Sequence, residues 1–258
     1  MSIHPTAVIA PTARIPESCT VGPYSTVGPD VVLGEDCELV SHVVLDGDLT
    51  VGARNRFFPF ACVGVSPQDL KYKDEPTRTV IGDDNTIRES VTISRGTVGG
   101  GGITQVGSHC LIMAYAHIGH DSSIGNHCIL ANAATLAGHV IVEDYATVGA
   151  LNAVHQYCRI GQYAYIGGGT IITQDVLPYS LTSAKREARA YGINKVGMER
   201  RGFDSARLRA LGHAYRILSA AKMNTTQAIA KLKEENIANE DVAYLIEFVE
   251  SAKRGILK

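Results

Sequence analysis

Aliphatic residues recur at every sixth position along most of this chain. One run extends from Ile3 to Val63, a second from Ile81 to Ile93 and a third from Val106 to Ile172, and 25 of these 26 positions are Ile, Leu or Val. An α-helix requires a period near 3.6 and a strand a period of two, so neither explains the spacing. Three hexads, or 18 residues, can instead close one triangular coil of a parallel β-helix. The repeat therefore predicts a β-helix over residues 1–178.

Two further positions of the hexad carry a preference. Glycine often follows the aliphatic residue, as at Gly22 and Gly107, and we expect it to supply the positive φ of a sharp corner. The fourth residue after the aliphatic one is small and should face the interior. Five of the six cysteines occupy this position, and no CxxC pair occurs. We therefore expect buried, reduced thiols rather than disulfides or metal ligands. The five are Cys19, Cys37, Cys110, Cys128 and Cys158.

The repeat is interrupted twice and ends before the C-terminus. Residues 64–80 and 99–105 leave the hexad pattern, and loops that leave a rigid scaffold often carry function. Residues 179–258 are predicted to form a small C-terminal α-helical domain. Three helices are expected there: from a cap at Asp204 to about Lys222, from Thr225 or Thr226 to Glu235, and from Asn239 to near Arg254 and Gly255.

Charge is distributed unevenly along the chain. The formal net charge is −2, yet residues 185–222 hold ten Lys and Arg against three Asp and Glu. Such a basic region suits an acidic partner or phosphates, although a solvated helical surface has the same composition. No apolar run reaches the roughly 20 residues of a membrane span, and the first residues lack the features of a signal peptide. We therefore expect a cytoplasmic protein with no integral membrane segment and no nucleic-acid partner.

The 18-residue coil places a group of histidines at one corner. His120, Gly138 and Gln156 should form one column across three coils, with Asp121 and His139 in the next column. Three interpretations compete: a solvated polar corner, a zinc site formed by His117, His120 and His139, or an acid–base site. In the last case His120 is a general base oriented by Asp121, and the Gly138 backbone N–H stabilises an oxyanion.

Several short motifs carry a specific resemblance. They are QDLKY (68–72), EPTR (75–78), AHIGHD (116–121), LAGHV (136–140), AVHQYCRIG (153–161) and RRGF (200–203). The chain resembles the UDP-N-acetylglucosamine 3-O-acyltransferase (LpxA) family from end to end. The resemblance implies an all-β left-handed parallel β-helix of hexapeptide repeats, a homotrimer, and active sites between neighbouring β-helices. It also implies transfer of an (R)-3-hydroxyacyl group from acyl carrier protein to the sugar's 3-hydroxyl, the first step of lipid A synthesis.

The resemblance also assigns roles to individual residues. His120 matches the general base, Asp121 its neighbour and Gly138 the oxyanion donor. The substrate-binding positions are Asp69 and Lys71 for the sugar and incoming groups, His117, His139, His155 and Gln156 elsewhere in the cleft, Asn194 and Arg200 for the nucleotide phosphates or pantetheine, and Gly168 for acyl length. No metal and no resident cofactor are expected, because the phosphopantetheine arrives on the carrier protein. The basic region 185–222 would dock that acidic carrier.

The chain departs from the family pattern in three places. Ser94 stands where many members have His, and Val196 stands where some members have Glu. After the last coil, Ala184 and Lys185, followed by Arg186, replace the common Gly-Asn. These departures leave open the acyl length and the choice between a 3-hydroxyl and a 3-amino acceptor. The N-acyltransferase of the next step is disfavoured, because that family carries an extra domain before its β-helix whereas hexads begin here at Ile3. A hexapeptide-repeat zinc hydratase and a non-enzymatic scaffold are the remaining alternatives.

Overall fold

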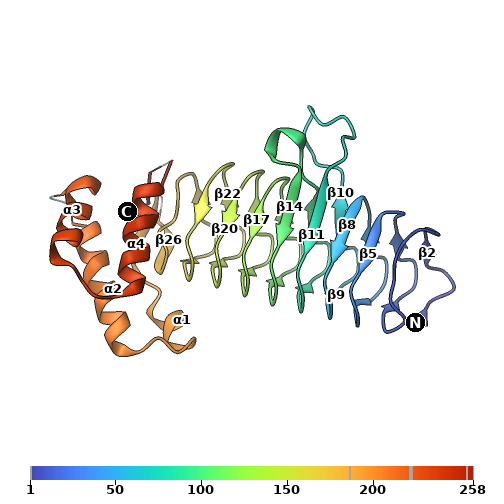
Figure 1. Ribbon diagram of the computed structural model, residues 1–258, viewed down its shortest axis with the longest axis horizontal. Helices are drawn as coiled ribbons and strands as arrows, with labels where there is room; N and C mark the ends of the chain where they lie inside the picture. Colours follow the sequence, from blue (N-terminus) through green and yellow to red (C-terminus); the bar gives the residue numbers. More distant parts are fainter. Residues whose placement is uncertain (1, 186, 221–222, 254, 258) are drawn as a thin grey trace.

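Most of the chain forms a triangular β-helix made of very short strands (Figure 1). The computed structural model describes residues 2–185, 187–220, 223–253 and 255–257. The first sheet contains, in spatial order, β1 (Ser2–Ile3), β3 (Thr20–Val21), β6 (Glu38–Leu39), β9 (Arg56–Phe57), β12 (Thr86–Ile87), β15 (Leu111–Ile112), β18 (Ile129–Leu130), β21 (Thr147–Val148), β24 (Tyr165–Ile166), β26 (Ser180–Lys185) and β27 (Glu187–Ile193).

The other two sheets are wholly parallel. The second contains β2 (Val8–Ile9), β4 (Thr26–Val27), β7 (Val44–Leu45), β10 (Cys62–Val65), β13 (Thr92–Ser94), β16 (His117–Ile118), β19 (Thr135–Leu136), β22 (Ala153–Val154) and β25 (Ile171–Ile172). The third contains β5 (Val31–Leu33), β8 (Asp48–Val51), β11 (Arg78–Ile81), β14 (Ile103–Val106), β17 (Ser123–Ile124), β20 (Ile141–Val142) and β23 (Arg159–Ile160).

Strand register follows the 18-residue coil. Val21 pairs with Leu39 and Ile118 with Leu136, so equivalent hexad positions are stacked along the axis. The aliphatic and small positions fill the interior, where Leu39, Ile118 and Leu136 have no exposed surface. The predicted fold class, a left-handed parallel β-helix with a small C-terminal helical domain, is confirmed.

The expectation that the glycine after the aliphatic residue supplies a positive φ is wrong. Positive φ occurs three positions after the aliphatic residue, at residues such as Tyr24 (58°) and Asp121 (58°). Of the described glycines directly after the aliphatic residue, Gly64 alone has positive φ (78°). The glycine is instead required by close stacking of the coils. A Cβ on Gly22 would lie 1.8 Å from the Val40 carbonyl oxygen, and one on Gly107 would lie 2.7 Å from the Gly125 carbonyl oxygen.

The repeat cysteines behave as predicted. All six cysteines are free, and the five at the small position are buried, whereas Cys62 is half-buried. The Sγ atoms of Cys19, Cys37, Cys110 and Cys128 donate to carbonyl oxygens 15 residues further along, at 3.1 or 3.2 Å. A small side chain with one weak donor therefore satisfies a corner carbonyl without widening the coil.

Both interruptions project from the same edge of the β-helix (Figure 1). The first leaves the second sheet after β10 and returns at β11. The second leaves after β13, forms the single 3-10 turn η1 (Val98–Gly100) and returns at β14. Arg95 binds two residues of the first excursion. Its Nε donates to the Tyr72 hydroxyl at 2.8 Å, and its Nη2 donates to the Ser66 hydroxyl at 2.8 Å.

The C-terminal part contains an element that the sequence did not predict. Strands β26 and β27 form an antiparallel hairpin, and β26 pairs with β24 and extends the first sheet. Among the described residues four helices follow, namely α1 (Lys195–Glu199), α2 (Ser205–Leu218), α3 (Thr225–Glu235) and α4 (Glu240–Ser251). They share a second apolar core that includes Tyr179, Leu211 and Phe248. No helix among the described residues is long and apolar enough to cross a membrane.

The helix caps were predicted better than the helix ends. Asp204 and Asn239 cap α2 and α4 as expected. The cap of α3 is Asn224, which forms a capping box with Gln227, and not Thr225 or Thr226. Helices α2 and α4 end at Leu218 and Ser251, earlier than expected, and the predicted ends Lys222 and Arg254 lie outside the described residues.

Candidate active site

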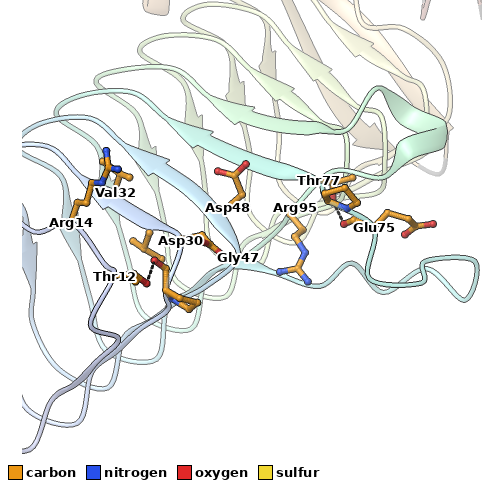
Figure 2. A pocket seen from close by; sticks show the side chains of 12 residues that line it. Thr12, Arg14, Asp30, Val32, Gly47, Asp48, Glu75, Thr77 and Arg95 are labelled. Carbon is orange, nitrogen blue, oxygen red and sulfur yellow. Dashed lines mark hydrogen bonds between the residues drawn. The ribbon is translucent and has the colours of Figure 1, made fainter.

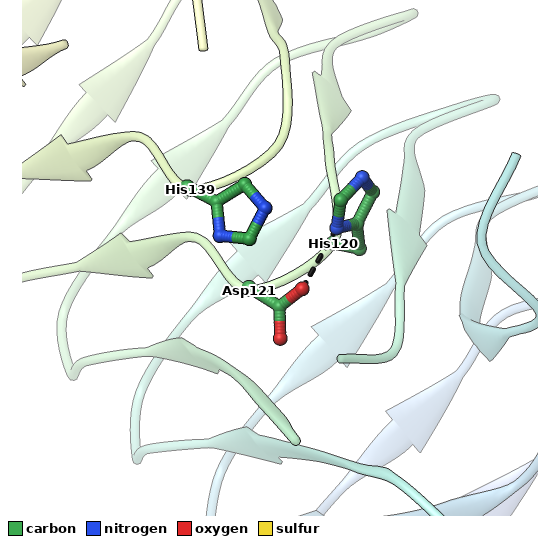
Figure 3. A group of neighbouring side chains, drawn as sticks. All are labelled: His120, Asp121 and His139. Carbon is green, nitrogen blue, oxygen red and sulfur yellow. Dashed lines mark hydrogen bonds and ion pairs between the residues drawn. The ribbon is translucent and has the colours of Figure 1, made fainter. Parts of the chain in front are cut away.

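His120 and Asp121 form a hydrogen-bonded pair at the corner that connects the second and third sheets (Figure 3). His120 Nδ1 lies 2.7 Å from Asp121 Oδ2, and the Asp121 side chain has no exposed surface. Because an ionised carboxylate only accepts, the imidazole proton belongs on Nδ1. The other nitrogen, Nε2, is then left with its lone pair, as a proton acceptor requires.

Asp121 is held by the second excursion as well as by His120. The Thr97 backbone N–H donates to Asp121 Oδ1 at 2.8 Å, and the Thr97 hydroxyl donates to Oδ2 at 2.6 Å. On the other side, the Asp121 N–H donates to Thr104 Oγ1 at 2.8 Å. These bonds satisfy the buried carboxylate and fix its direction.

Gly138 lies next to the imidazole, one coil further along. A Cβ at this position would be 2.6 Å from both Nε2 and Cε1 of His120, so the ring occupies the space that any other residue would need. Among the described residues, no hydrogen-bond acceptor is recorded for the Gly138 N–H. The amide is therefore available to a ligand beside the imidazole nitrogen that carries the lone pair.

The predicted column geometry is confirmed for His139. The His139 ring stacks on Tyr157 with centroids 4.4 Å apart and meets His120 edge-on at 5.0 Å. His117, on β16, places its Nδ1 2.7 Å from the Thr92 hydroxyl. Burial lowers the pKa of both His117 and His139, and the nearby His120 lowers both further. These two rings are therefore predominantly neutral at pH 7.

A metal would have to compete with this hydrogen-bond network. His120, Asp121 and His139 bring one ligand atom each within 4.8 Å of one another, whereas the zinc set suggested by the sequence included His117 instead of Asp121. Metal binding through Asp121 would displace donors from an oxygen that already accepts from Thr97 and His120. The observed contacts therefore match an acid–base pair better than a metal centre.

The first excursion reaches the same corner. Asp69 Oδ1 accepts from the Lys71 N–H at 2.9 Å within a tight turn. The Asp69 charge opposes the lowering of the His139 pKa, so the two side chains are close enough to interact electrostatically. Lys71 is exposed, and Leu70 between them is fully exposed at the tip.

The predicted residues fall into two groups on different edges of the β-helix. His155 and Gln156 lie at the His120 corner, where His155 Nδ1 is 3.0 Å from the Gln156 carbonyl oxygen, and both side chains are exposed. Gly168 lies instead at the corner between the first and second sheets, which is also exposed. One copy of the chain does not bring Gly168 together with His120.

Asn194 and Arg200 belong to the second group. Asn194 caps α1 by accepting from the Gly197 N–H at 3.2 Å, and its amide donates to the Tyr163 carbonyl oxygen at 3.1 Å. Both residues line a pocket of about 520 Å³ against the first sheet, together with Val196. Of the other departures, Ser94 is buried on β13, and Arg186 lies outside the described residues.

One cavity in the described part of the chain contains no predicted site residue. It has a volume of about 720 Å³ and lies near the N-terminal coils (Figure 2). Its lining mixes charges, with Arg14 and Arg95 among Asp30, Asp48 and Glu75.

The sequence did not predict the contacts of Thr97, Thr104 and Gly100, which contact Asp121 or approach it closely. The interruption at residues 99–105 was the available signal for Gly100 and Thr104, and Thr97 lies two residues before it.

A hexapeptide β-helix whose corner pairs a half-buried histidine with a buried aspartate defines this chain as a hexapeptide-repeat transferase. Residues 12–47 and 103–138 match the family model described as bacterial transferase hexapeptide (six repeats). Residues 175–257 match the model for domain 2 of UDP N-acetylglucosamine O-acyltransferase.

Similar proteins cover the whole chain. Acyl-[acyl-carrier-protein]–UDP-N-acetylglucosamine O-acyltransferases from Thermodesulfovibrio yellowstonii and Syntrophobacter fumaroxidans are 47% and 45% identical, over 99% and 100% of both chains respectively. The solved acyltransferase structure from Acinetobacter baumannii superposes with a TM-score of 0.95 at 40% identity, over 99% of each chain. This chain therefore belongs to the acyl-[acyl-carrier-protein]–UDP-N-acetylglucosamine O-acyltransferase family, and it is an acyltransferase.

Proposed function

We propose that this enzyme transfers an (R)-3-hydroxyacyl group from acyl carrier protein to the 3-hydroxyl of UDP-N-acetylglucosamine, the first step of lipid A synthesis, with His120 as general base. The observation that carries this proposal is the His120 Nδ1–Asp121 Oδ2 bond of 2.7 Å. It leaves Nε2 beside Gly138, whose N–H has no acceptor among the residues that the structure describes. Base and oxyanion donor are thus adjacent, as acyl transfer to a hydroxyl requires. We also propose that it acts in the cytoplasm, where nucleotide sugars are made.

The reaction needs two steps at this corner. His120 Nε2 takes the proton from the sugar hydroxyl while its oxygen attacks the thioester carbonyl carbon. The resulting oxyanion accepts a hydrogen bond from the Gly138 N–H. When the tetrahedral intermediate collapses, the C–S bond breaks and the imidazolium returns its proton to the departing pantetheine thiolate. The chain supplies no cofactor in this scheme, because the phosphopantetheine enters on the carrier protein.

Substrate contacts are proposed from the first excursion and from both edges. Asp69 and Lys71 would bind the sugar near His120, with His117, His139, His155 and Gln156 along the same cleft. Asn194 and Arg200 would meet the nucleotide phosphates or the pantetheine arm, because they line an open pocket with an exposed guanidinium. Gly168 would set acyl length by leaving room for a long chain, since it lacks a side chain; a Cβ added there would lie 3.0 Å from the Ala150 carbonyl oxygen.

We propose a homotrimer in which the two groups come from neighbouring copies. The corner that carries Gly168 also exposes large apolar side chains, namely Tyr24, Phe60, Tyr115 and Leu151. A repeated contact between this corner and a neighbour's His120 corner closes into a ring, as cyclic oligomers do. The test mixes two inactive variants, His120→Ala and Arg200→Ala, after unfolding and refolding together. Recovered activity in the mixture is expected, and none would be recovered if both residues served a site within one copy.

The carrier protein is proposed to dock on the basic region 185–222. Arg200, Arg209 and Arg216 are exposed and form no ion pair with any described residue. Charge reversal by Arg209→Glu should raise KM for the acylated carrier and weaken its salt dependence. The matched control is Arg14→Glu at the other end of the β-helix, for which no such change is expected.

A mass-spectrometric assay tests the proposed activity directly. Purified enzyme, hydroxyacyl carrier proteins of several chain lengths and either UDP-N-acetylglucosamine or its 3-amino analogue would be incubated, and the acylated sugar identified. We expect O-acylated product and a loss of about 10²-fold or more in His120→Ala. Near wild-type turnover in His120→Ala would refute the mechanism, and exclusive use of the amino sugar would refute the acceptor assignment.

A further inference from the structure

Thr97 is the residue through which the second excursion contacts the His120–Asp121 pair. Its backbone N–H and its hydroxyl donate to the two different oxygens of the Asp121 carboxylate, at 2.8 and 2.6 Å. Oδ2 therefore accepts from the Thr97 hydroxyl and from His120 Nδ1, at 2.6 and 2.7 Å. Thr97 is almost fully buried, at 9% exposed, so water competes little for these bonds.

The rest of the excursion is built to hold Thr97 in this place. The Thr97 carbonyl oxygen accepts from the N–H groups of Gly100 and Gly102, at 3.0 and 2.8 Å, which closes the loop on itself. Gly100 lies so close that a Cβ would be 2.1 Å from Asp121 Cγ and 2.5 Å from His139 Cε1. The run of glycines therefore permits a loop to pack directly on the carboxylate.

We infer that Thr97 is a positioning residue for acyl transfer, which acts on His120 by orienting the Asp121 carboxylate and by sharing its Oδ2. The inference rests on the proposed role of His120 as general base. The shared oxygen has a chemical consequence. A hydroxyl that donates to Oδ2 withdraws negative charge from the atom that faces the imidazole. Without that donor the carboxylate would stabilise the protonated imidazolium more strongly and would be less firmly oriented.

The test is Thr97→Val, which keeps the branched shape and removes the hydroxyl. We expect kcat to fall about ten-fold, as for loss of a hydrogen bond to a charged group, with little change in KM for the UDP sugar. The acidic limb of the kcat profile should move to higher pH by about half a unit. Thr97→Ser keeps the donor and should restore both values to near wild type.

Two comparisons separate positioning from general damage. Thr182→Val is the matched control, because Thr182 is buried on β26 and its hydroxyl has no partner among the described groups. It should leave kcat and the pH profile unchanged. In an Asp121→Asn background, the effect of Thr97→Val should largely disappear, since both changes act through one carboxylate. If the valine variant melts at a lower temperature than wild type, Thr97→Ala serves in the same comparisons.

Three outcomes would overturn the inference: unchanged kcat in Thr97→Val, a fall in kcat with an unmoved acidic limb, or an equal fall in the Asp121→Asn background. These outcomes are distinct from failure of the proposed function. That failure would appear as an absence of acylated UDP sugar from the wild-type enzyme, or as full activity in His120→Ala. If the wild-type enzyme is active and His120→Ala is not, the Thr97 variants decide whether Thr97 is a positioning residue.

Discussion

Replacement of Gly138 by alanine tests the geometry of the site most directly. The new Cβ would lie 2.6 Å from Nε2 and Cε1 of His120, whereas carbon atoms in contact are separated by about 3.5–4.0 Å. The ring must therefore move by roughly 1 Å, and a displacement of this size in a reacting group costs about 10²-fold in rate. The same movement would stretch the His120–Asp121 hydrogen bond, now 2.7 Å long. We expect kcat to fall about 100-fold.

The assay is steady-state transfer followed by mass spectrometry, with thermal melting measured in parallel. Gly212→Ala in α2 is the matched control, because its Cβ would meet only Ile193 Cδ1 at an ordinary 3.8 Å. Its kcat should equal that of the wild type. A Gly138→Ala enzyme that folds normally and retains wild-type kcat would show that the position of His120 beside this glycine does not matter for the reaction.

Three further predictions concern stability and reactivity. Gly212→Ala should raise the free energy of unfolding by about 0.5–1 kcal/mol in chemical denaturation, since alanine is preferred within a helix; a lower value would contradict this. Burial lowers the pKa of His117, so the unfolded chain binds a proton at higher pH than the folded chain does. The free energy of unfolding should therefore rise with pH up to about 6.5, and His117→Gln should flatten that slope in melting curves. A thiol reagent should label only Cys62 in the native protein, as intact mass would report, and rapid labelling of Cys110 or Cys128 would contradict their burial.

The hexad pattern predicted most of the β-helix because its information is local and repeated. Each aliphatic residue is buried by the coil it belongs to, so a spacing of six is sufficient to indicate the fold. The hairpin of β26 and β27 escaped prediction for the opposite reason. Its strand β26 is defined by pairing with β24, a contact to a preceding coil that no period within residues 180–193 reveals.

The glycines show how a correct observation received a wrong cause. Glycine after the aliphatic residue suggested a left-handed backbone, yet the left-handed residues are Tyr24, Asp121, His139 and others that carry side chains. Several of these side chains pack against the residue one coil away, as Tyr24 does on His42 and His139 on Tyr157. The positive φ is therefore tolerated at residues with a Cβ because coil stacking compensates for its strain. The sequence alone offered no means of separating backbone freedom from lack of space.

The sequence predicted the part of the candidate site that lies within the 18-residue coils, and it did not predict the part that lies outside them. His120, Gly138 and Asp121 could be stacked by counting, because the β-helix converts separation in sequence into separation in space. Thr97 lies 24 residues before Asp121, and only the length of the inserted loop decides what it contacts. Counting coils also could not bring Asn194 and Arg200 together with the histidines, because a second copy of the chain would be needed to do so. Loop packing therefore supplies a part of this site that the repeat does not encode, and assembly would supply Asn194 and Arg200 in the proposed trimer.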